Sequence, residues 1–359
     1  MTAIKKHKSA LNEMEGISNP EITDDNAISK IKFKRKKQPS AKDLVAGIFK
    51  GNITDLSRAI TLIESKNPKH LEKANIIIKA CLPKANNSIR IGITGVPGVG
   101  KSTFIESFGL HLTSLGKKVA VLAVDPSSSL TKGSILGDKT RMEDLVKNPN
   151  AFIRPSASGD SLGGVARKTR ETIILCEAAG FDTIIIETVG VGQSETAVHS
   201  MVDFFLLLKL AGAGDELQGI KRGIIEMADA IVINKADGDN IKRAKLAKVE
   251  FNRALHLYPL KASNWTPKVS ICSAIENKGV NEVWEMILEY TSLTKGNSFF
   301  DEKRNEQNKF WLIQTIEEQL QQDFFGREEI KNALKEQLAL IELNKTTPFV
   351  AAEYLLSLK

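Results

Sequence analysis

The chain has 359 residues, of which 42% are hydrophobic and 26% charged, the composition of an ordinary globular protein with one large domain or two. Its longest apolar runs, such as Phe204–Leu208, are far shorter than the roughly 20 residues of a membrane helix. Of the formal net charge of +7, residues 1–50 contribute +5, because they hold eleven basic and six acidic residues, which leaves +2 for the rest. We therefore expect neither a membrane span nor the basic surface that nucleic-acid binding requires.

Residues 1–40 are polar, rich in lysine and without a sustained apolar period, so we expect a basic, disordered leader. The leader lacks the apolar segment of a secretory signal, and its acidic residues are atypical of a mitochondrial transit peptide. The three cysteines, at positions 81, 176 and 272, have no metal-ligand spacing and favour a reducing compartment. These features together predict a cytoplasmic protein.

Apolar residues at helical spacing predict an N-terminal helical segment over residues 41–85, which Pro83 ends. Residues 86–294 alternate short apolar runs with helical stretches such as Ser102–Leu115, which Gly116 closes. The predicted strands are Arg90–Thr94, Lys118–Val124, Thr183–Glu187, Asp203–Lys209, Ala230–Asn234 and Lys268–Cys272. This alternation predicts an α/β domain with a mostly parallel central sheet flanked by helices, and ligands bind such sheets at the carboxyl ends of the strands.

Residues 295–359 contain no strand signal and return to a helical pattern. An apolar stripe at helical spacing consists of Phe310, Ile313, Ile316 and Leu320, and Ile330–Leu343 continues the pattern. Such a stripe can pack on the preceding domain or form a dimer face, and its spacing alone does not separate the two.

A phosphate-binding motif follows the first predicted strand. Gly95-x4-Gly100-Lys101-Ser102 matches the P-loop pattern in the strand-to-helix context that the motif requires. Glycines let backbone N–H groups curl around phosphate oxygens, the lysine adds a positive charge, and the serine hydroxyl ligates Mg²⁺. We expect the nucleotide phosphates to be bound by Gly95, Val96, Pro97, Gly98, Val99, Gly100, Lys101, Ser102 and Thr103. The resulting fold class is a P-loop NTPase.

Three acidic residues are candidates for a magnesium site beside Ser102. Asp125 and Glu187 end predicted strands, and Asp138 lies on the intervening loop. Each alone can be a helix cap or a surface acid, but together, beside a P-loop, they favour Mg²⁺ ligation. Glu187-Thr188-Val189-Gly190 also resembles a GTPase switch segment, in which Gln193 or Glu195 can position the attacking water. Lys101, Glu187 and Gln193 are therefore the predicted catalytic residues.

A base-reading motif follows the fifth of these strands. Asn234-Lys235-Ala236-Asp237 lies 133 residues after Lys101. The carboxylate of Asp237 can accept two hydrogen bonds from guanine, which adenine cannot donate in the same way. Ser273, Ala274 and Ile275 follow the next strand and fit the segment whose backbone reads the guanine carbonyl. The predicted ligand is therefore GTP or GDP rather than ATP.

Long unbroken strings in the chain resemble one particular family. They are Val121–Ser129, Gly137–Met142, Ile153–Ser156, Glu187–Glu195 and Gly212–Gly223. They look like the G-protein chaperones of methylmalonyl-CoA mutase, a family that includes the methylmalonic aciduria type A proteins and bacterial members once labelled arginine/ornithine transport ATPases. The resemblance covers residues 41–359 and leaves out the basic leader.

The resemblance implies a GTPase that docks on an adenosylcobalamin-dependent acyl-CoA mutase, gates the loading of its cofactor, and protects or reactivates it. It implies Mg²⁺ ligation by Ser102 and the three acids, and a homodimer built by the C-terminal helices. It further implies a loop that signals to the mutase. Its charged residues are Asp215, Glu216, Lys221 and Arg222.

Two other classes of protein compete with this interpretation. A metallochaperone GTPase needs clustered ligands, whereas the five histidines are isolated and no cysteine pair exists. A transport-associated ATPase or kinase is disfavoured by the guanine-reading motif. Arg141, Arg154 and Arg170 are candidates for a residue that completes charge stabilisation during hydrolysis, and only geometry can choose among them.

Overall fold

The computed structural model describes residues 39–65, 67–124, 142–155, 162–188, 194–212 and 222–358. Residues 41–359 form one compact unit. Apart from its last two residues, the predicted leader over residues 1–40 lies outside the described residues. Among the helices described, each is too short or too polar to cross a membrane.

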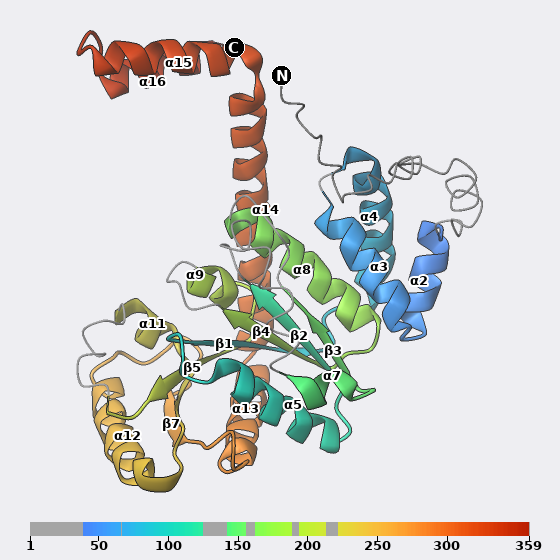
Figure 1. Cartoon of the computed structure of the whole chain (residues 1–359), viewed down its shortest axis with the longest axis vertical. Coiled ribbons are helices and arrows are strands. Elements are labelled where there is room, and N and C mark those ends of the chain that lie inside the picture. The colour runs from blue at the N-terminus through green and yellow to red at the C-terminus, as the bar shows by residue number, and fades with distance from the viewer. Residues whose placement is uncertain are drawn as a thin grey trace, which may run out of the picture. The chain divides into compact units, whose positions relative to one another are not determined.

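A seven-stranded sheet forms the centre of this unit (Figure 1), and every neighbouring pair of its strands is parallel. The strands are β1 (Ile89–Gly95), β2 (Val119–Val124), β3 (Ala151–Arg154), β4 (Thr183–Thr188), β5 (Phe204–Leu210), β6 (Ala230–Asn234) and β7 (Lys268–Ile271). Their order across the sheet is β3-β2-β4-β1-β5-β6-β7. The predicted parallel α/β fold is therefore confirmed.

Strand β3 was missing from the sequence-based prediction. It has four residues, lies at the edge of the sheet and buries only Phe152 and Ile153. A run this short carries no detectable period, so only its pairing with β2 identifies it as a strand. The six predicted strands all exist, with ends that move by one residue at most.

Both faces of the sheet are covered by helices, which explains why the central strands read as continuous apolar runs. The helices of this region are α5 (Lys101–Ser114), α7 (Glu143–Lys147), α8 (Leu162–Ala178), α9 (Ser194–His199), α11 (Arg222–Met227), α12 (Ile241–Leu255) and α13 (Val280–Gly296). One face packs against α5, α7 and α13, and the other against α8, α9, α11 and α12. Alternate residues of one strand, such as Phe204 and Phe205 in β5, enter different cores.

Three N-terminal helices precede the sheet: α2 (Ala41–Phe49), α3 (Ile53–Glu64) and α4 (Pro68–Cys81). The side chain of Asn52 caps α3 and that of Asn67 caps α4, satisfying backbone donors that a helix start leaves unpaired. The apolar faces of these helices join the core on the α8 side of the sheet. A short 3-10 turn, Leu82–Lys84, ends the segment at the predicted proline.

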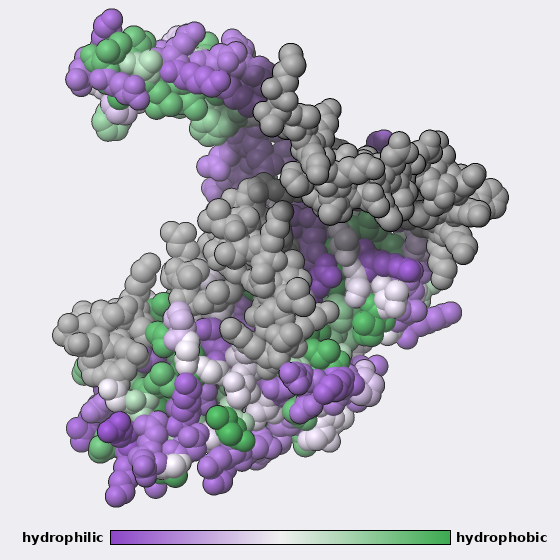
Figure 2. All heavy atoms as spheres, in the orientation of Figure 1, coloured by the Kyte–Doolittle hydropathy of each residue, from purple (hydrophilic) through white to green (hydrophobic). Residues whose placement is uncertain are grey.

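The C-terminal helices are α14 (Phe299–Gly326), α15 (Glu328–Glu342) and α16 (Pro348–Ser357). The first half of α14 is anchored to the sheet-containing core, and α15 and α16 pack on each other (Figure 1). The predicted stripe on α14 does not pack on the preceding domain, because Phe310, Ile313, Ile316 and Leu320 are 47%, 53%, 47% and 62% exposed. Green apolar atoms are also visible on the α15–α16 pair in Figure 2.

Candidate functional site

The P-loop curls between the end of β1 and the start of α5. Gly95, Gly98 and Gly100 have φ of 156°, 81° and 91°, a region that side chains with a Cβ rarely adopt. A Cβ on Gly95 would lie 2.6 Å from the carbonyl oxygen of Leu208, and one on Gly100 would lie 2.9 Å from Nδ2 of Asn234. Glycine is therefore required at these two positions by both backbone conformation and space.

Lys101 lies inside this curl and is only 9% exposed. Its Nζ donates to the carbonyl oxygens of Gly95 at 2.8 Å and Val96 at 3.3 Å. Burial lowers the pKa of this ammonium group, and the nearby carboxylates of Glu187 and Glu195 oppose that shift. The arrangement holds a positive charge in a loop of backbone amides at a helix N-terminus, where an anion is favoured.

Two oxygen donors suited to Mg²⁺ lie together beside the P-loop. Ser102 Oγ is 3.4 Å from Oε1 of Glu187, whose carboxylate extends from the end of β4 and is largely buried. Hard oxygen ligands of this kind fit magnesium. Across residues 39–358 with the stated gaps, no group of three or more His, Cys, Asp and Glu side chains could hold a metal ion. The other predicted ligands, Asp125 and Asp138, lie outside the described residues.

A pair of threonines that the sequence analysis did not single out joins the P-loop strand to its neighbour. Oγ1 of Thr188, at the end of β4, donates to Oγ1 of Thr94, near the end of β1, at 2.8 Å, and both side chains are buried. Strands β1 and β4 pair with Ile93 opposite Glu187, which brings these ends together. Hydroxyl residues one position from the predicted phosphate and metal ligands were the only signal available in the sequence.

The end of β6 connects directly to the P-loop. Asn234 Nδ2 donates to the carbonyl oxygen of Val99 at 2.9 Å, and Lys235 Nζ donates to that of Gly98 at 2.9 Å. Asn234 is 1% exposed, and its Oδ1 has no hydrogen-bond partner in the described part of the chain. Lys235 has φ of 56°, which directs its side chain back over the glycine loop. The two predicted motifs are therefore in direct contact.

Asp237 faces the loop after β7, as the base-site prediction requires. Its Oδ2 accepts a hydrogen bond from Oγ of Ser273 at 2.7 Å, and this hydroxyl oxygen also accepts the backbone N–H of Glu276 at 3.2 Å. Ser273 exchanges two backbone hydrogen bonds with Lys278, at 2.9 and 3.0 Å, so the loop is closed on itself. These contacts orient the Asp237 carboxylate.

The remaining residues of the predicted base segment differ in exposure. Ala274 is 7% exposed, and Ile275, with 77% exposure, presents its side chain to solvent. Only the backbone of Ile275 is therefore placed to contribute to such a site.

The predicted hydrolysis residues are only partly placed. Gln193 lies outside the described residues, whereas Glu195 is buried in α9, close enough to Lys101 to affect its pKa. Of the arginine candidates, Arg154 forms an ion pair with Glu64 of α3, and Arg170 donates to the carbonyl oxygen of Gln307 in α14 at 3.3 Å. Both are engaged away from the P-loop, and the third candidate, Arg141, lies outside the described residues.

The predicted signalling loop is also mostly outside the described residues. This applies to Asp215, Glu216 and Lys221. The backbone of Arg222 begins α11, and its side chain is not among those described.

Comparison with known proteins gives the same family along most of the chain. The sequence model for "Methylmalonyl Co-A mutase-associated GTPase MeaB" matches residues 56–329. The chain is 45% identical over 298 residues to GTPase ArgK of Escherichia coli, covering 83% of this chain and 90% of that protein. It is 44% identical over 317 residues to the mitochondrial methylmalonic aciduria type A homolog of Mus musculus, covering 86% and 75%.

Among solved structures, the crystal structure of an LAO/AO transport system kinase is similar over 90% of this chain and 98% of that one. The TM-score is 0.73 and the sequence identity 37%. The matched range 56–329 contains both the P-loop and the segments around Asn234 and Ser273, so the similarity includes the whole candidate site.

Proposed function

This chain belongs to the methylmalonyl Co-A mutase-associated GTPase family, and we propose that it is a magnesium-dependent chaperone of an adenosylcobalamin-dependent acyl-CoA mutase. The chain is a P-loop GTPase that binds guanine nucleotide, as its named relatives are GTPases. Its role is to gate adenosylcobalamin loading and to protect or reactivate the mutase. The family description and the methylmalonic aciduria type A relative support a mutase as partner.

The observation that carries the nucleotide-binding part of the proposal is the hydrogen bond between Asn234 and the P-loop carbonyl of Val99. It joins a phosphate-binding loop to a guanine-reading loop, so one ligand can occupy both. In this assignment the phosphates are bound by Gly95, Val96, Pro97, Gly98, Val99, Gly100, Lys101, Ser102 and Thr103. The base is bound by Asn234, Lys235, Asp237, Ser273, Ala274 and Ile275.

Bound Mg²⁺ supplies charge neutralisation of the phosphates during hydrolysis. Ser102 and Glu187 would hold it, together with Asp125 and Asp138. Lys101 stabilises the charge that develops on the transferred phosphoryl group, and Gln193 positions the attacking water. The loop with Asp215, Glu216, Lys221 and Arg222 signals the nucleotide state to the mutase.

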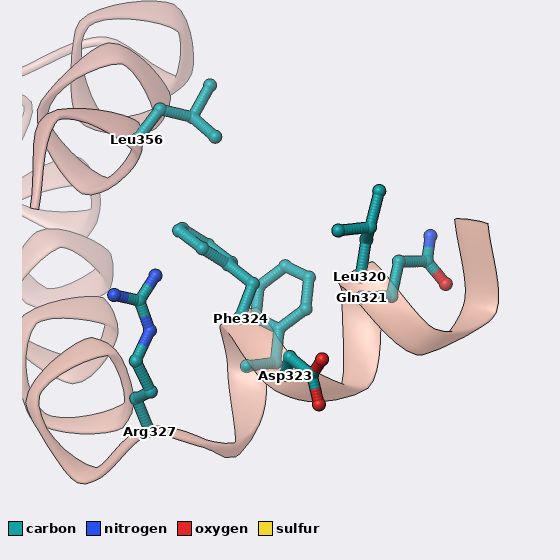
Figure 3. A pocket seen from close by; sticks show the side chains of 7 residues that line it. Leu320, Gln321, Asp323, Phe324, Arg327 and Leu356 are labelled. Carbon is teal, nitrogen blue, oxygen red and sulfur yellow. The ribbon is translucent and has the colours of Figure 1, made fainter. Parts of the chain in front are cut away.

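We assign the division of labour along the chain as part of the same proposal. Residues 1–40 are a leader, 41–85 a helical segment, 86–294 the GTPase domain and 295–359 a segment that forms a homodimer. The exposed stripe on α14 supports the dimer, as does a cavity of about 570 Å³ at the junction of α14 with α15 and α16. Leu320, Phe324 and Leu356 line this cavity (Figure 3). A monomeric mass by light scattering at micromolar concentration would remove the dimer from the proposal.

The decisive experiment is a pull-down of an adenosylcobalamin-dependent acyl-CoA mutase by the full chain, with GDP or a non-hydrolysable GTP analogue present. We expect retention of the mutase, with an affinity that differs between the two nucleotides. Equal, negligible retention in both states would overturn the chaperone role and leave the GTPase activity intact. ATP that competes with GTP at equal concentration would instead contradict the assigned base site and favour a transport-associated ATPase.

A further inference from the structure

The first half of α14 grips the main chain that joins α9 to β5. Three of its side chains each donate to a carbonyl oxygen of residues 200–203. Lys303 Nζ binds Asp203 O at 2.7 Å, Gln307 Nε2 binds Val202 O at 2.8 Å, and Trp311 Nε1 binds Ser200 O at 3.1 Å. These donors are spaced by four residues, so they form one face of the helix. Directional bonds to successive carbonyls fix the position of this connection more sharply than apolar contact alone.

Arg304 fixes the same part of α14 to the amino ends of β1 and β5. Its Nε and Nη2 bind the two carboxylate oxygens of Asp203 at 2.8 and 2.7 Å. Its guanidinium also donates to the carbonyl oxygens of Asn86 at 2.9 Å and Ser88 at 2.7 Å, just before β1. The guanidinium is almost fully buried, and its paired hydrogen bonds fix the position of α14 relative to the start of β1 and β5.

Helix α9 connects α14 to the phosphate site. At its start, the side chain of Glu195 is buried. Near its end, Val198 packs so closely on β1 that a Cβ at Gly92 would lie 3.0 Å from its Cγ1. Its last residue, His199, is followed directly by the carbonyls that α14 binds. Val198 lies only two residues before Ser200, so a displacement of the main chain that α14 binds also moves the side chain that packs on β1.

Trp311 also contacts α8, so the grip involves a second helix of the same face. The guanidinium of Arg170 lies 5.5 Å from the centroid of the Trp311 ring and donates to the main chain of α14. The Trp311 side chain therefore meets an arginine of α8 with its ring and donates its N–H to the carbonyl oxygen of Ser200, just after α9.

We propose that Lys303, Gln307 and Trp311 are positioning residues that hold α9, and with it Val198 against β1, the strand that leads into the P-loop, so that α14 and the nucleotide site respond to each other. The inference rests on the proposed GTPase site and adds a route by which the C-terminal helices respond to the bound nucleotide. The route runs along described contacts from α14 to residues 200–203, through Val198 of α9 to Gly92 of β1, and from Gly95 at the end of β1 to Nζ of Lys101 at 2.8 Å.

The first test uses tryptophan emission in the full chain, which has three tryptophans. The double variant Trp265→Phe/Trp284→Phe keeps Trp311 as the only emitter, and Trp284→Phe/Trp311→Phe keeps Trp265. Trp265 is a matched control because its Nε1 also donates to a buried carbonyl, that of Asp229, at 2.8 Å. We expect the emission of Trp311 to differ between saturating GDP and a non-hydrolysable GTP analogue, and that of Trp265 to be the same. Identical Trp311 spectra, or equal changes at both sites, would overturn the inference.

The second test separates positioning from a merely structural role. Trp311→Phe and Trp265→Phe each remove one indole hydrogen bond, so we expect similar decreases in melting temperature. Only Trp311→Phe is expected to lower kcat for GTP hydrolysis, by about fivefold, the effect of one buried hydrogen bond, with KM unchanged. Gln307→Leu should behave like Trp311→Phe. A wild-type kcat in both α14 variants would refute the coupling, whereas absence of hydrolysis in the wild-type chain would refute the GTPase site itself.

Discussion

The amino and carboxyl ends of the strands use charged side chains in different ways. At the amino ends of the strands, two buried arginines form ion pairs. Arg90 pairs with Glu177 at 2.9 Å and Arg304 with Asp203 at 2.7 Å. At the carboxyl ends, Lys101 and Lys235 donate instead to neutral carbonyls of the P-loop. The arginines at the amino ends are therefore neutralised by carboxylates of the protein, whereas the two lysines at the carboxyl ends both point to the P-loop.

This difference separates stability from function. Removing one partner of a buried ion pair leaves the other charge buried and unpaired, so the expected effect is a lower free energy of unfolding. A cation held by carbonyls gains more from an anionic ligand than from its protein partners, so its loss is felt as lost binding or catalysis. Removing a cation at the amino ends should therefore lower stability, whereas removing one at the carboxyl ends should lower nucleotide binding or hydrolysis.

The largest effect is expected from Arg304→Met, which leaves Asp203 buried without its cation. The free energy of unfolding should fall by about 3–5 kcal/mol, the usual cost of removing one member of a buried pair. Urea denaturation monitored by circular dichroism measures it. The matched control is Arg167→Met, because Arg167 pairs with Glu171 at 3.2 Å on a partly exposed surface of α8. The free energy of unfolding of that control should fall by less than about 1 kcal/mol. Equal losses in the two variants would contradict the stabilising role of the buried ion pair at the amino ends of the strands.

Lys101→Ala tests the carboxyl ends of the strands, where the P-loop lies. We expect kcat for GTP hydrolysis to fall by about 100- to 1,000-fold, the range seen when one group that stabilises transition-state charge is removed. The melting temperature of the nucleotide-free protein should not fall, because the variant removes a buried ammonium group whose pKa is lowered by desolvation. Phosphate release and thermal unfolding give the two readouts. Full activity, or unfolding without loss of activity per folded molecule, would contradict the assignment.

His199 sharpens the comparison through pH. Burial lowers its pKa from 6.5 to about 4, and nearby Lys303 and Lys261 add to the shift while Asp229 opposes it. The unfolded chain therefore takes up a proton that the folded protein rejects, so this stability is complete above pH 6.5 and is lost as the pH falls toward 4. The full loss is about 3 kcal/mol.

His199→Phe keeps an aromatic ring against Phe205, which the histidine contacts edge-on at 5.4 Å. Comparing urea unfolding of the wild type and this variant at pH 7 and pH 4.5 isolates the histidine from carboxylates that titrate in the same range. We expect the difference in stability between the two pH values to be smaller in the variant. An unchanged difference would show that His199 does not titrate in this window.

The smallest effect concerns base choice. Asp237→Ala removes the carboxylate that Ser273 orients, and the affinity for GDP should fall by about 10- to 100-fold, the worth of charged hydrogen bonds to the base. The melting temperature should change little, because the Ser273 loop keeps its backbone bonds to Lys278 and the bond from the Glu276 N–H to Ser273 Oγ. Isothermal titration with GDP and ADP reports the loss of discrimination. Unaltered preference for GDP would place base recognition elsewhere.

The sequence by itself determined the parts of this protein that depend on local pattern. Glycine spacing identifies the P-loop because only glycine accepts its backbone angles, and apolar runs identify six of seven strands because a strand buried on both faces must be apolar throughout. The short edge strand β3 escaped because four residues carry no period. The predicted guanine preference followed from the Asn234–Asp237 motif and its distance from the P-loop, both of which can be read from the sequence.

Only the tertiary structure decided which distant groups meet. Asn234 binds Val99 across 135 residues, Thr188 binds Thr94 across 94, and Arg304 binds Asp203 across 101. These pairs depend on strand order and register, which place the ends of β1, β4, β5 and β6 side by side although they are far apart in the chain. The same holds for α14, whose pattern predicted a helix but not that three of its side chains grip the end of α9. A local sequence pattern specifies the shape of an element, whereas its neighbours are chosen by the free energy of packing the whole chain.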